Sequence, residues 1–298
     1  MPAPHPAPAG PGPLTLRVTT ADGVPIAVRH DPAQGPRAEP GTAFVVAHGF
    51  TGTWRRPEIR DVVAVLSRRA GVVSFDFRGH GGSGGVSTLG AREVLDLDAA
   101  VGWARGLGYR RVATLGWSLG AAVCIRHAAL HGGVDAVVAA SGPSRWHYRG
   151  TRPMRVVHLA VGTPLGRLVL ARRFHTRVGR TPWDPRPEPP DAVVGRIAPT
   201  PLLVVHGDAD RYFPVEHARW LARAAGAPSE LWIEPGFGHA ERAAGVDLTT
   251  RIAEWMLRAV AESAPSAETA EQSAGSAVTG DADGGASEGS RRSARMPG

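Results

Sequence analysis

Five residues near the middle of the chain have the types and spacing of a serine nucleophile. Gly116-Trp117-Ser118-Leu119-Gly120 follows the apolar run 111–116 and opens a helical pattern over 118–131. A G-x-S-x-G sequence between a strand and a helix forms a tight, strained turn that presents the serine hydroxyl above the helix N-terminus. Glycine at both ends lets the backbone fold back without a side-chain clash. The pattern predicts that Ser118 attacks a carbonyl carbon.

A serine hydroxyl is a weak nucleophile and needs a positioned base and an acid behind that base. Among twelve histidines, His239 has the right position, because it follows the apolar run 230–234 in the sequence GFGHAE. The acid is expected in HGDADRYFP, directly after the run 201–207, where Asp210 is favoured and Asp208 competes with it. The chain order Ser, Asp, His agrees with the G-x-S-x-G turn.

Alternating strand-like and helical patterns predict an α/β fold with a doubly wound, mostly parallel, eight-stranded sheet. A turn at Asp22-Gly23 predicts that the first two strands form a hairpin. Active sites of such sheets lie at the carboxyl ends of the strands, where Ser118, Asp210 and His239 all fall. The strands are expected at 14–20, 24–30, 43–49, 72–77, 111–116, 134–141, 201–207 and 230–234, and the core helices at 57–70, 91–107, 118–131, 215–226 and 247–262.

One segment is too long to be an ordinary connection between strands. Residues 143–197 follow the sixth strand, contain helical patterns at 154–161 and 164–175, and end in a proline-rich stretch. They predict a helical cap inserted into a core made of residues 14–142 and 198–262. Residues 1–13 are expected to be a flexible leader. Residues 263–298 are rich in Ala, Ser, Gly and acids and are expected to be a disordered tail.

Four motifs in order resemble those of the α/β hydrolases, in the group that includes serine esterases, monoacylglycerol-lipase-like enzymes and serine aminopeptidases. The resemblance spans about residues 14–260 and implies an oxyanion hole built from the backbone N–H groups of Phe50 and Leu119. It also implies a structural role for the second motif. The four motifs are His48-Gly49-Phe50, the segment 76–83, the segment 116–120, and the segment 206–214 followed by His239.

The predicted chemistry is acyl transfer. Ser118 would cleave a carboxylic ester or thioester through an acyl-enzyme, with His239 as base and Asp210 as the orienting acid. No cofactor fingerprint and no metal-ligand spacing are present, so no cofactor and no metal are expected. The same triad would serve an acyltransferase or a peptidase. A non-catalytic ligand-binding protein is less favoured, because such proteins usually have a broken triad. Four tryptophans could line an acyl pocket: Trp54, Trp117, Trp146 and Trp183.

Positive charge is concentrated in the predicted cap. The chain has a net charge of +7, and residues 144–196 carry eleven arginines against three acids. Besides a small-molecule acyl substrate, candidate partners of the cap are an anionic membrane surface and an anionic substrate such as a coenzyme A thioester or a phospholipid. The alternative is a solvated basic helix face. Nucleic acid is disfavoured because no array of stacking aromatics accompanies the charge.

Three further features bear on the location of the protein. The one cysteine, Cys124, excludes an intramolecular disulfide and is expected to be a small buried hydrophobe. No run of eighteen apolar residues and no secretory signal are found. A cytoplasmic location is therefore expected.

Overall fold

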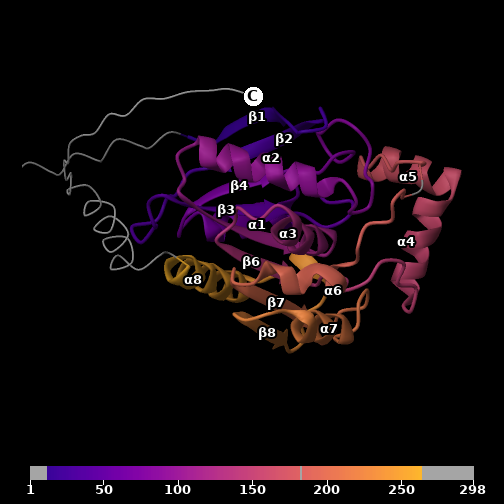
Figure 1. Ribbon diagram of the computed structural model, residues 1–298. Helices are drawn as coiled ribbons and strands as arrows, with labels where there is room; N and C mark the ends of the chain where they lie inside the picture. The colour runs from indigo at the N-terminus through magenta and orange to yellow at the C-terminus, as the bar shows by residue number, and fades with distance from the viewer. Residues whose placement is uncertain (1–11, 182, 264–298) are drawn as a thin grey trace, which may run out of the picture. The chain divides into compact units, whose positions relative to one another are not determined.

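The fold is built on one sheet of eight strands. A computed structural model describes residues 12–181 and 183–263, so most of the predicted leader and of the predicted tail lie outside the described residues. The strand order is β1-β2-β4-β3-β5-β6-β7-β8, with β1 and β8 at the edges (Figure 1). The strands are β1 (Leu14–Thr19), β2 (Pro25–Asp31), β3 (Thr42–Ala47), β4 (Gly71–Phe75), β5 (Arg111–Trp117), β6 (Ala136–Ala140), β7 (Leu202–Gly207) and β8 (Ser229–Glu234).

Strand directions confirm the predicted mostly parallel sheet. The hairpin of β1 and β2 is antiparallel, and β2 also runs antiparallel to β4. All the other neighbouring strands are parallel. The chain therefore brings the carboxyl ends of β3 to β8 to one edge of the sheet, where loops can share a site.

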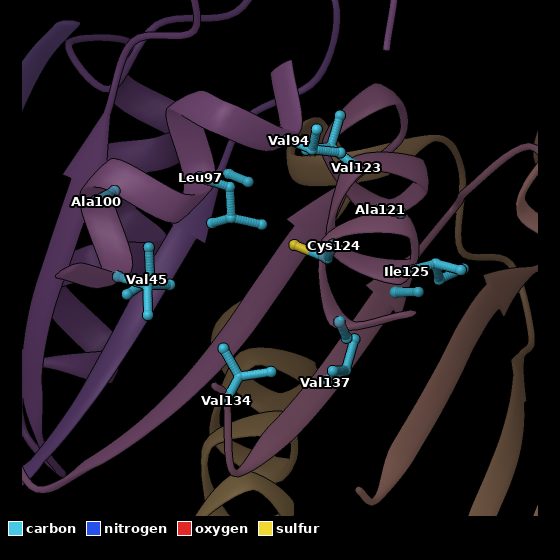
Figure 2. Packing of buried hydrophobic residues seen from close by; sticks show 14 of the residues in the cluster. Val45, Val94, Leu97, Ala100, Ala121, Val123, Cys124, Ile125, Val134 and Val137 are labelled. Carbon is cyan, nitrogen blue, oxygen red and sulfur yellow. The ribbon is translucent and has the colours of Figure 1, made fainter. Parts of the chain in front are cut away.

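Helices cover both faces of the sheet. Side chains alternate along each strand, so Phe44 and Val46 of β3 join the apolar cluster under α1 and α8, while Val45 joins the cluster under α2 and α3. Cys124 of α3 is buried among Val45 and other apolar side chains of the second cluster, as predicted (Figure 2). These helices are α1 (Pro57–Leu66), α2 (Glu93–Gly106), α3 (Leu119–Leu130) and α8 (Val246–Glu262).

The segment between β6 and β7 consists of two parts. Its first part holds α4 (Arg152–Gly162) and α5 (Pro164–Phe174), which pack against each other beside the layered core (Figure 1). Its second part, α6 (Pro190–Val193) and the 3-10 helix η1 (Val194–Ile197), packs against α3, with Val193, Val194 and Ile197 in the core cluster. The predicted cap boundary at 197 therefore includes residues that belong to the core by packing. The remaining helices are α7 (Glu216–Ala224) and the 3-10 helix η2 (Ala240–Arg242).

Within the part of the chain that the structure describes, no single helix is long and apolar enough to cross a membrane. The pair α4 and α5 satisfies the length and composition criterion together, but the two helices are bent by 101° at the break between them.

Candidate active site

Ser118 lies in a strained turn between β5 and α3. Its backbone has φ 53° and ψ −110°, values that a residue with a side chain rarely adopts. A Cβ atom at Gly116 would lie 2.3 Å from the carbonyl oxygen of Gly120, and one at Gly120 would lie 2.3 Å from that of Ala47. The turn therefore requires glycine on both sides of Ser118.

The Ser118 side chain is the first member of a series of two hydrogen bonds. Its Oγ lies 3.0 Å from Nε2 of His239, and Nδ1 of the same ring lies 2.8 Å from Oδ2 of Asp210. The ring of Tyr212 stacks on the imidazole with centroids 4.3 Å apart. The structure thus brings the three residues that the sequence predicts into one hydrogen-bonded series.

Strand register explains why these loops meet. Ala47 at the end of β3 lies opposite Gly116 at the end of β5, so the loop after β3 leaves the sheet beside the Ser118 turn. Gly207 of β7 lies opposite Glu234 of β8, which places the loops carrying the acid and the histidine next to each other. A Cβ atom at Gly49 would lie 3.4 Å from the Cβ atom of Ser118.

The Asp210 carboxylate is held by its own loop. Its side chain is fully buried, and Oδ1 accepts hydrogen bonds from the backbone N–H groups of Tyr212 and Phe213 at 2.7 and 3.1 Å. The competing acid, Asp208, is exposed and accepts a hydrogen bond from the N–H of Gly236 at 2.7 Å. Of the two aspartates, Asp210 is the one that contacts His239.

The two predicted oxyanion donors flank the serine. Phe50 and Leu119 line the same cavity as Ser118. Leu119 is the first residue of α3, so its N–H has no partner within the helix. Phe50 lies in the loop that passes beside Ser118. Leu119 also lies at the positive end of the dipole of α3.

Two buried histidines form hydrogen bonds in the loops next to the site, one in the loop of Phe50 and one in the loop of Asp210. His48 is neutral at physiological pH, because burial lowers the pKa of its ring to about 4. Its Nε2 accepts a hydrogen bond from the N–H of Phe77 at 3.1 Å, and its Nδ1 donates to the carbonyl of Gly49 at 2.7 Å. His206 likewise donates to the carbonyl of Phe213 at 2.9 Å, in the loop of the acid. Neither His48 nor His206 contacts Ser118, which agrees with a positioning role.

A large cavity of about 1890 Å³ opens above Ser118. Pockets for small ligands typically hold roughly 300–1,000 Å³, so this cavity has room for a long or bulky substrate. Helices α4 and α5 form part of its wall. The apolar side chains that line it include Val86, Leu89, Trp146, Met154, Val157, Val161, Leu170, Phe174 and Trp183.

Two of the four tryptophans predicted to line a pocket do not do so. Trp117 is fully buried and Trp54 nearly so, and both belong to the apolar cluster under α1 and α8. Residues 117 and 118 are neighbours, but the Trp117 side chain packs on that face of the sheet while Ser118 lines the cavity. The prediction for Trp54 and Trp117 was therefore wrong. Trp146 and Trp183 do line the cavity, with ring centroids 5.5 Å apart.

Sequence reasoning missed Glu241, a buried carboxyl group beside the nucleophile. It lies in η2, two residues after His239, and lines the cavity. Its Oε2 has no hydrogen-bond partner among the described residues, and burial raises the pKa of the carboxyl group. One Cβ atom added at Gly49 would touch both Glu241 Oε2 and Ser118 Cβ at 3.4 Å. The carboxyl group and the serine therefore both lie next to Gly49.

In the described ranges 12–181 and 183–263, no group of three His, Cys, Asp or Glu side chains is arranged to hold a metal ion.

Comparisons with known proteins find related sequences and folds. The model of the alpha/beta hydrolase family matches residues 44–247. Monoacylglycerol lipase of Mycolicibacterium smegmatis is 28% identical over 240 residues, which cover 68% of this chain and 83% of that protein. The solved structure of the Pyrococcus furiosus esterase Pf2001 aligns with a TM-score of 0.65 at 24% identity, over 83% of this chain and 92% of that chain. Est1E of Butyrivibrio proteoclasticus with bound ferulic acid aligns with a TM-score of 0.58 at 21% identity, over 83% and 99% of the two chains.

Proposed function

This chain belongs to the alpha/beta hydrolase family, and from that premise we propose that it is a serine esterase that cleaves carboxylic esters with large apolar acyl groups through an acyl-enzyme on Ser118. The observation that carries the proposal is the series Ser118, His239 and Asp210, hydrogen-bonded at 3.0 and 2.8 Å at the base of an apolar cavity.

The first step is attack by the serine. Asp210 accepts a hydrogen bond from the Nδ1–H of His239, so Nε2 is the basic nitrogen and faces Ser118 Oγ. In our proposal His239 takes the hydroxyl proton as Ser118 bonds to the ester carbonyl carbon. The carbonyl oxygen becomes an oxyanion, which the N–H groups of Phe50 and Leu119 stabilise.

The second step releases the alcohol and restores the serine. The imidazolium gives its proton to the leaving alkoxide as the bond from carbon to that oxygen breaks. Water then enters and, as His239 removes one of its protons, its oxygen bonds to the acyl carbon. The bond between that carbon and Ser118 Oγ then breaks, the imidazolium returns its proton to Ser118 Oγ, and the acyl group leaves as a carboxylic acid. Asp210 keeps the ring in the right tautomer and stabilises the imidazolium in both steps. Its two hydrogen bonds to backbone N–H groups hold the carboxylate in place.

Cavity size and lining support the acyl part of the proposal. A small ester would fill little of a space of about 1890 Å³, and the wall formed by α4 and α5 is largely apolar. The M. smegmatis relative is a monoacylglycerol lipase, which agrees with a lipid ester as substrate. A thioester would react by the same steps.

The test is labelling by a fluorophosphonate probe, followed by hydrolysis of p-nitrophenyl esters from acetate to palmitate. We expect the wild type to be labelled and Ser118→Ala to lose both labelling and at least about 10⁴-fold of its turnover. Ser229→Ala, at an exposed serine of β8, is the matched control. Maximal kcat/KM at a medium or long acyl chain is expected. A folded wild type that takes no label contradicts the proposal.

An acyltransferase would use the same triad and differ only in the acceptor. Adding glycerol or an amine to the ester assay separates the two activities. Free carboxylic acid as the main product supports the esterase. If most of the acyl group is transferred to the acceptor, the protein is an acyltransferase. If amide substrates are cleaved at a rate similar to that of esters, it is a peptidase.

A further inference from the structure

Exposed apolar side chains gather on one pair of helices. Eleven large hydrophobic residues are exposed in the described part of the chain, and six of them lie on α4 and α5. Leu165 is the most exposed, at 71%. The five others are Val156, Leu159, Leu168, Val169 and Phe174. A monomeric surface seldom concentrates apolar side chains in this way unless it contacts something.

Helix α4 has two different faces. At 3.6 residues per turn, Arg152, Arg155, Val156 and Leu159 share one face, and all four are exposed. The residues on the opposite face, which include Met154, Val157 and Val161, line the cavity above Ser118, and Val156 at the edge of the outer face lines it too. The outer face therefore borders the active-site cavity.

Helix α5 repeats the pattern in reverse order. Leu165, Leu168, Val169 and Arg172 share an exposed face, with the apolar residues first and the arginine last. The two helices meet at Thr163, whose hydroxyl accepts a hydrogen bond from the N–H of Gly166 and so caps α5. The two helices are bent by 101° at this point, and Leu159 and Leu165 lie near the bend, whereas Arg152, Arg155 and Arg172 lie toward the outer ends of the two helices.

Positive charge around this face is not balanced by acids. Residues 144–183 contain no Asp and no Glu. The cap's ion pairs use Arg145 with Asp191 and Arg196 with Glu188, which lie outside α4 and α5. Four exposed arginines of the helix pair form no ion pair with a described carboxylate: Arg152, Arg155, Arg172 and Arg173.

We propose that the outer face of α4 and α5 docks on an anionic lipid surface. The apolar side chains near Thr163 insert at the level of the upper acyl chains, and the arginines at the outer ends bind the head-group phosphates. A second copy of this chain fits less well, because a symmetric contact would set arginines against arginines. Val156 and Phe174 belong both to the exposed apolar set and to the cavity lining, so the docked surface would lie beside the cavity above Ser118.

Co-sedimentation with vesicles tests docking separately from catalysis. The inactive Ser118→Ala protein is mixed with phosphatidylcholine vesicles that contain or lack phosphatidylglycerol. We expect strong binding to the anionic vesicles, weak binding to the neutral ones, and a decrease at high salt. Equal binding to both vesicle types, or no binding, overturns the proposal. Because this protein cannot turn over substrate, the result does not depend on the proposed function.

Matched pairs of variants locate the surface. Leu159→Ser with Leu165→Ser, and separately Arg152→Gln with Arg155→Gln, should each weaken binding to anionic vesicles at least about tenfold. The controls carry the same changes at exposed residues elsewhere: Leu107→Ser with Leu130→Ser, and Arg68→Gln with Arg258→Gln.

On the otherwise wild-type background, the cap variants should keep p-nitrophenyl acetate hydrolysis, which shows that they are folded. Cap variants that bind like the wild type, or a wild-type dimer in ultracentrifugation that they abolish, overturn the proposal.

Discussion

Asp208 and Asp210 are separated by one residue, yet their carboxylates have different partners. Asp210 Oδ2 lies 2.8 Å from His239 Nδ1, whereas Asp208 Oδ1 accepts a hydrogen bond from the N–H of Gly236. The contact with His239 favours one tautomer of the imidazole, and the contact with Gly236 stabilises a turn. The two aspartates are therefore a matched pair for testing the acid of the proposed triad.

Asp210→Asn should lower kcat/KM by about 10⁴-fold, because an amide in place of the carboxylate favours the wrong tautomer of His239. Asp208→Asn should change kcat/KM by no more than a few-fold. Ester hydrolysis under identical conditions measures both, and circular dichroism checks the fold. A larger loss in Asp208→Asn would show that the acid assignment is wrong.

The glycines around Ser118 should be intolerant of even one added carbon. In Gly116→Ala the new Cβ would meet the Gly120 carbonyl at 2.3 Å, so the turn must open. We expect a loss of roughly 3 kcal/mol in the free energy of unfolding, and loss of probe labelling. Gly102→Ala in α2 is the control, since no atom lies within 4 Å of its added Cβ. It should stabilise the protein by about 0.5–1 kcal/mol. Urea titration measures both, and equal stability for the two variants would contradict the strained turn.

The sheet and the Ser118 turn were predictable because each depends on a short-range pattern. Strands covered on both faces must be continuous apolar runs, so β3, β5 and β7 are visible in the sequence. The Ser118 turn is fixed by two glycines within five residues. Chain order then assigned Asp210 and His239, because loops after parallel strands meet at one edge of the sheet.

What could not be predicted depends on packing between distant segments. Nothing in the sequence around Trp117 tells which face of the sheet its ring occupies. The helical segment with Val193 and Val194 reads as part of the cap until its contacts with α3 are seen. From the sequence alone, Glu241 would be taken for a surface acid, because the neighbours of its segment, the loop of Gly49 and helix α1, are distant in the chain.

Acid should destabilise the fold through buried neutral histidines. Burial lowers the pKa of His48, His80 and His217 to about 4 each. His48 Nε2 and His217 Nδ1 also accept hydrogen bonds from the N–H groups of Phe77 and Ser144, and protonation would break these bonds. The unfolded chain takes up protons near pH 6.5 and the folded chain only near pH 4. Stability is therefore full above pH 6.5 and is lost as the pH falls toward 4.

Each of these histidines should contribute roughly 3 kcal/mol to that loss, since one pKa unit corresponds to about 1.4 kcal/mol. Urea unfolding between pH 7.5 and 4.5 measures it. His217→Gln should flatten the pH dependence, whereas His175→Gln, at an exposed site, should leave it unchanged. An unchanged urea midpoint over this pH range would contradict the prediction.

The buried carboxylate of Glu241 should lower the free energy of unfolding at neutral pH and contribute to activity. Its raised pKa means that its contribution to stability is most favourable below the pKa of the unfolded chain and is lost as the pH rises through the folded pKa. Glu241→Gln keeps the shape and removes the buried charge, so it should be more stable than the wild type at pH 8 and lose that advantage toward pH 4. Because the carboxyl group lies next to Gly49, as Ser118 does, and is close enough to His239 to feel its charge, kcat/KM should fall about tenfold in the same variant, whereas its stability should rise. Urea titration at the two pH values and ester hydrolysis at pH 8 measure the two effects, with Glu39→Gln at an exposed site as the control.

A variant that is more stable and equally active would show that Glu241 has no role in the reaction. A variant that is less stable at pH 8 would show that its carboxylate has a stabilising partner in the folded protein.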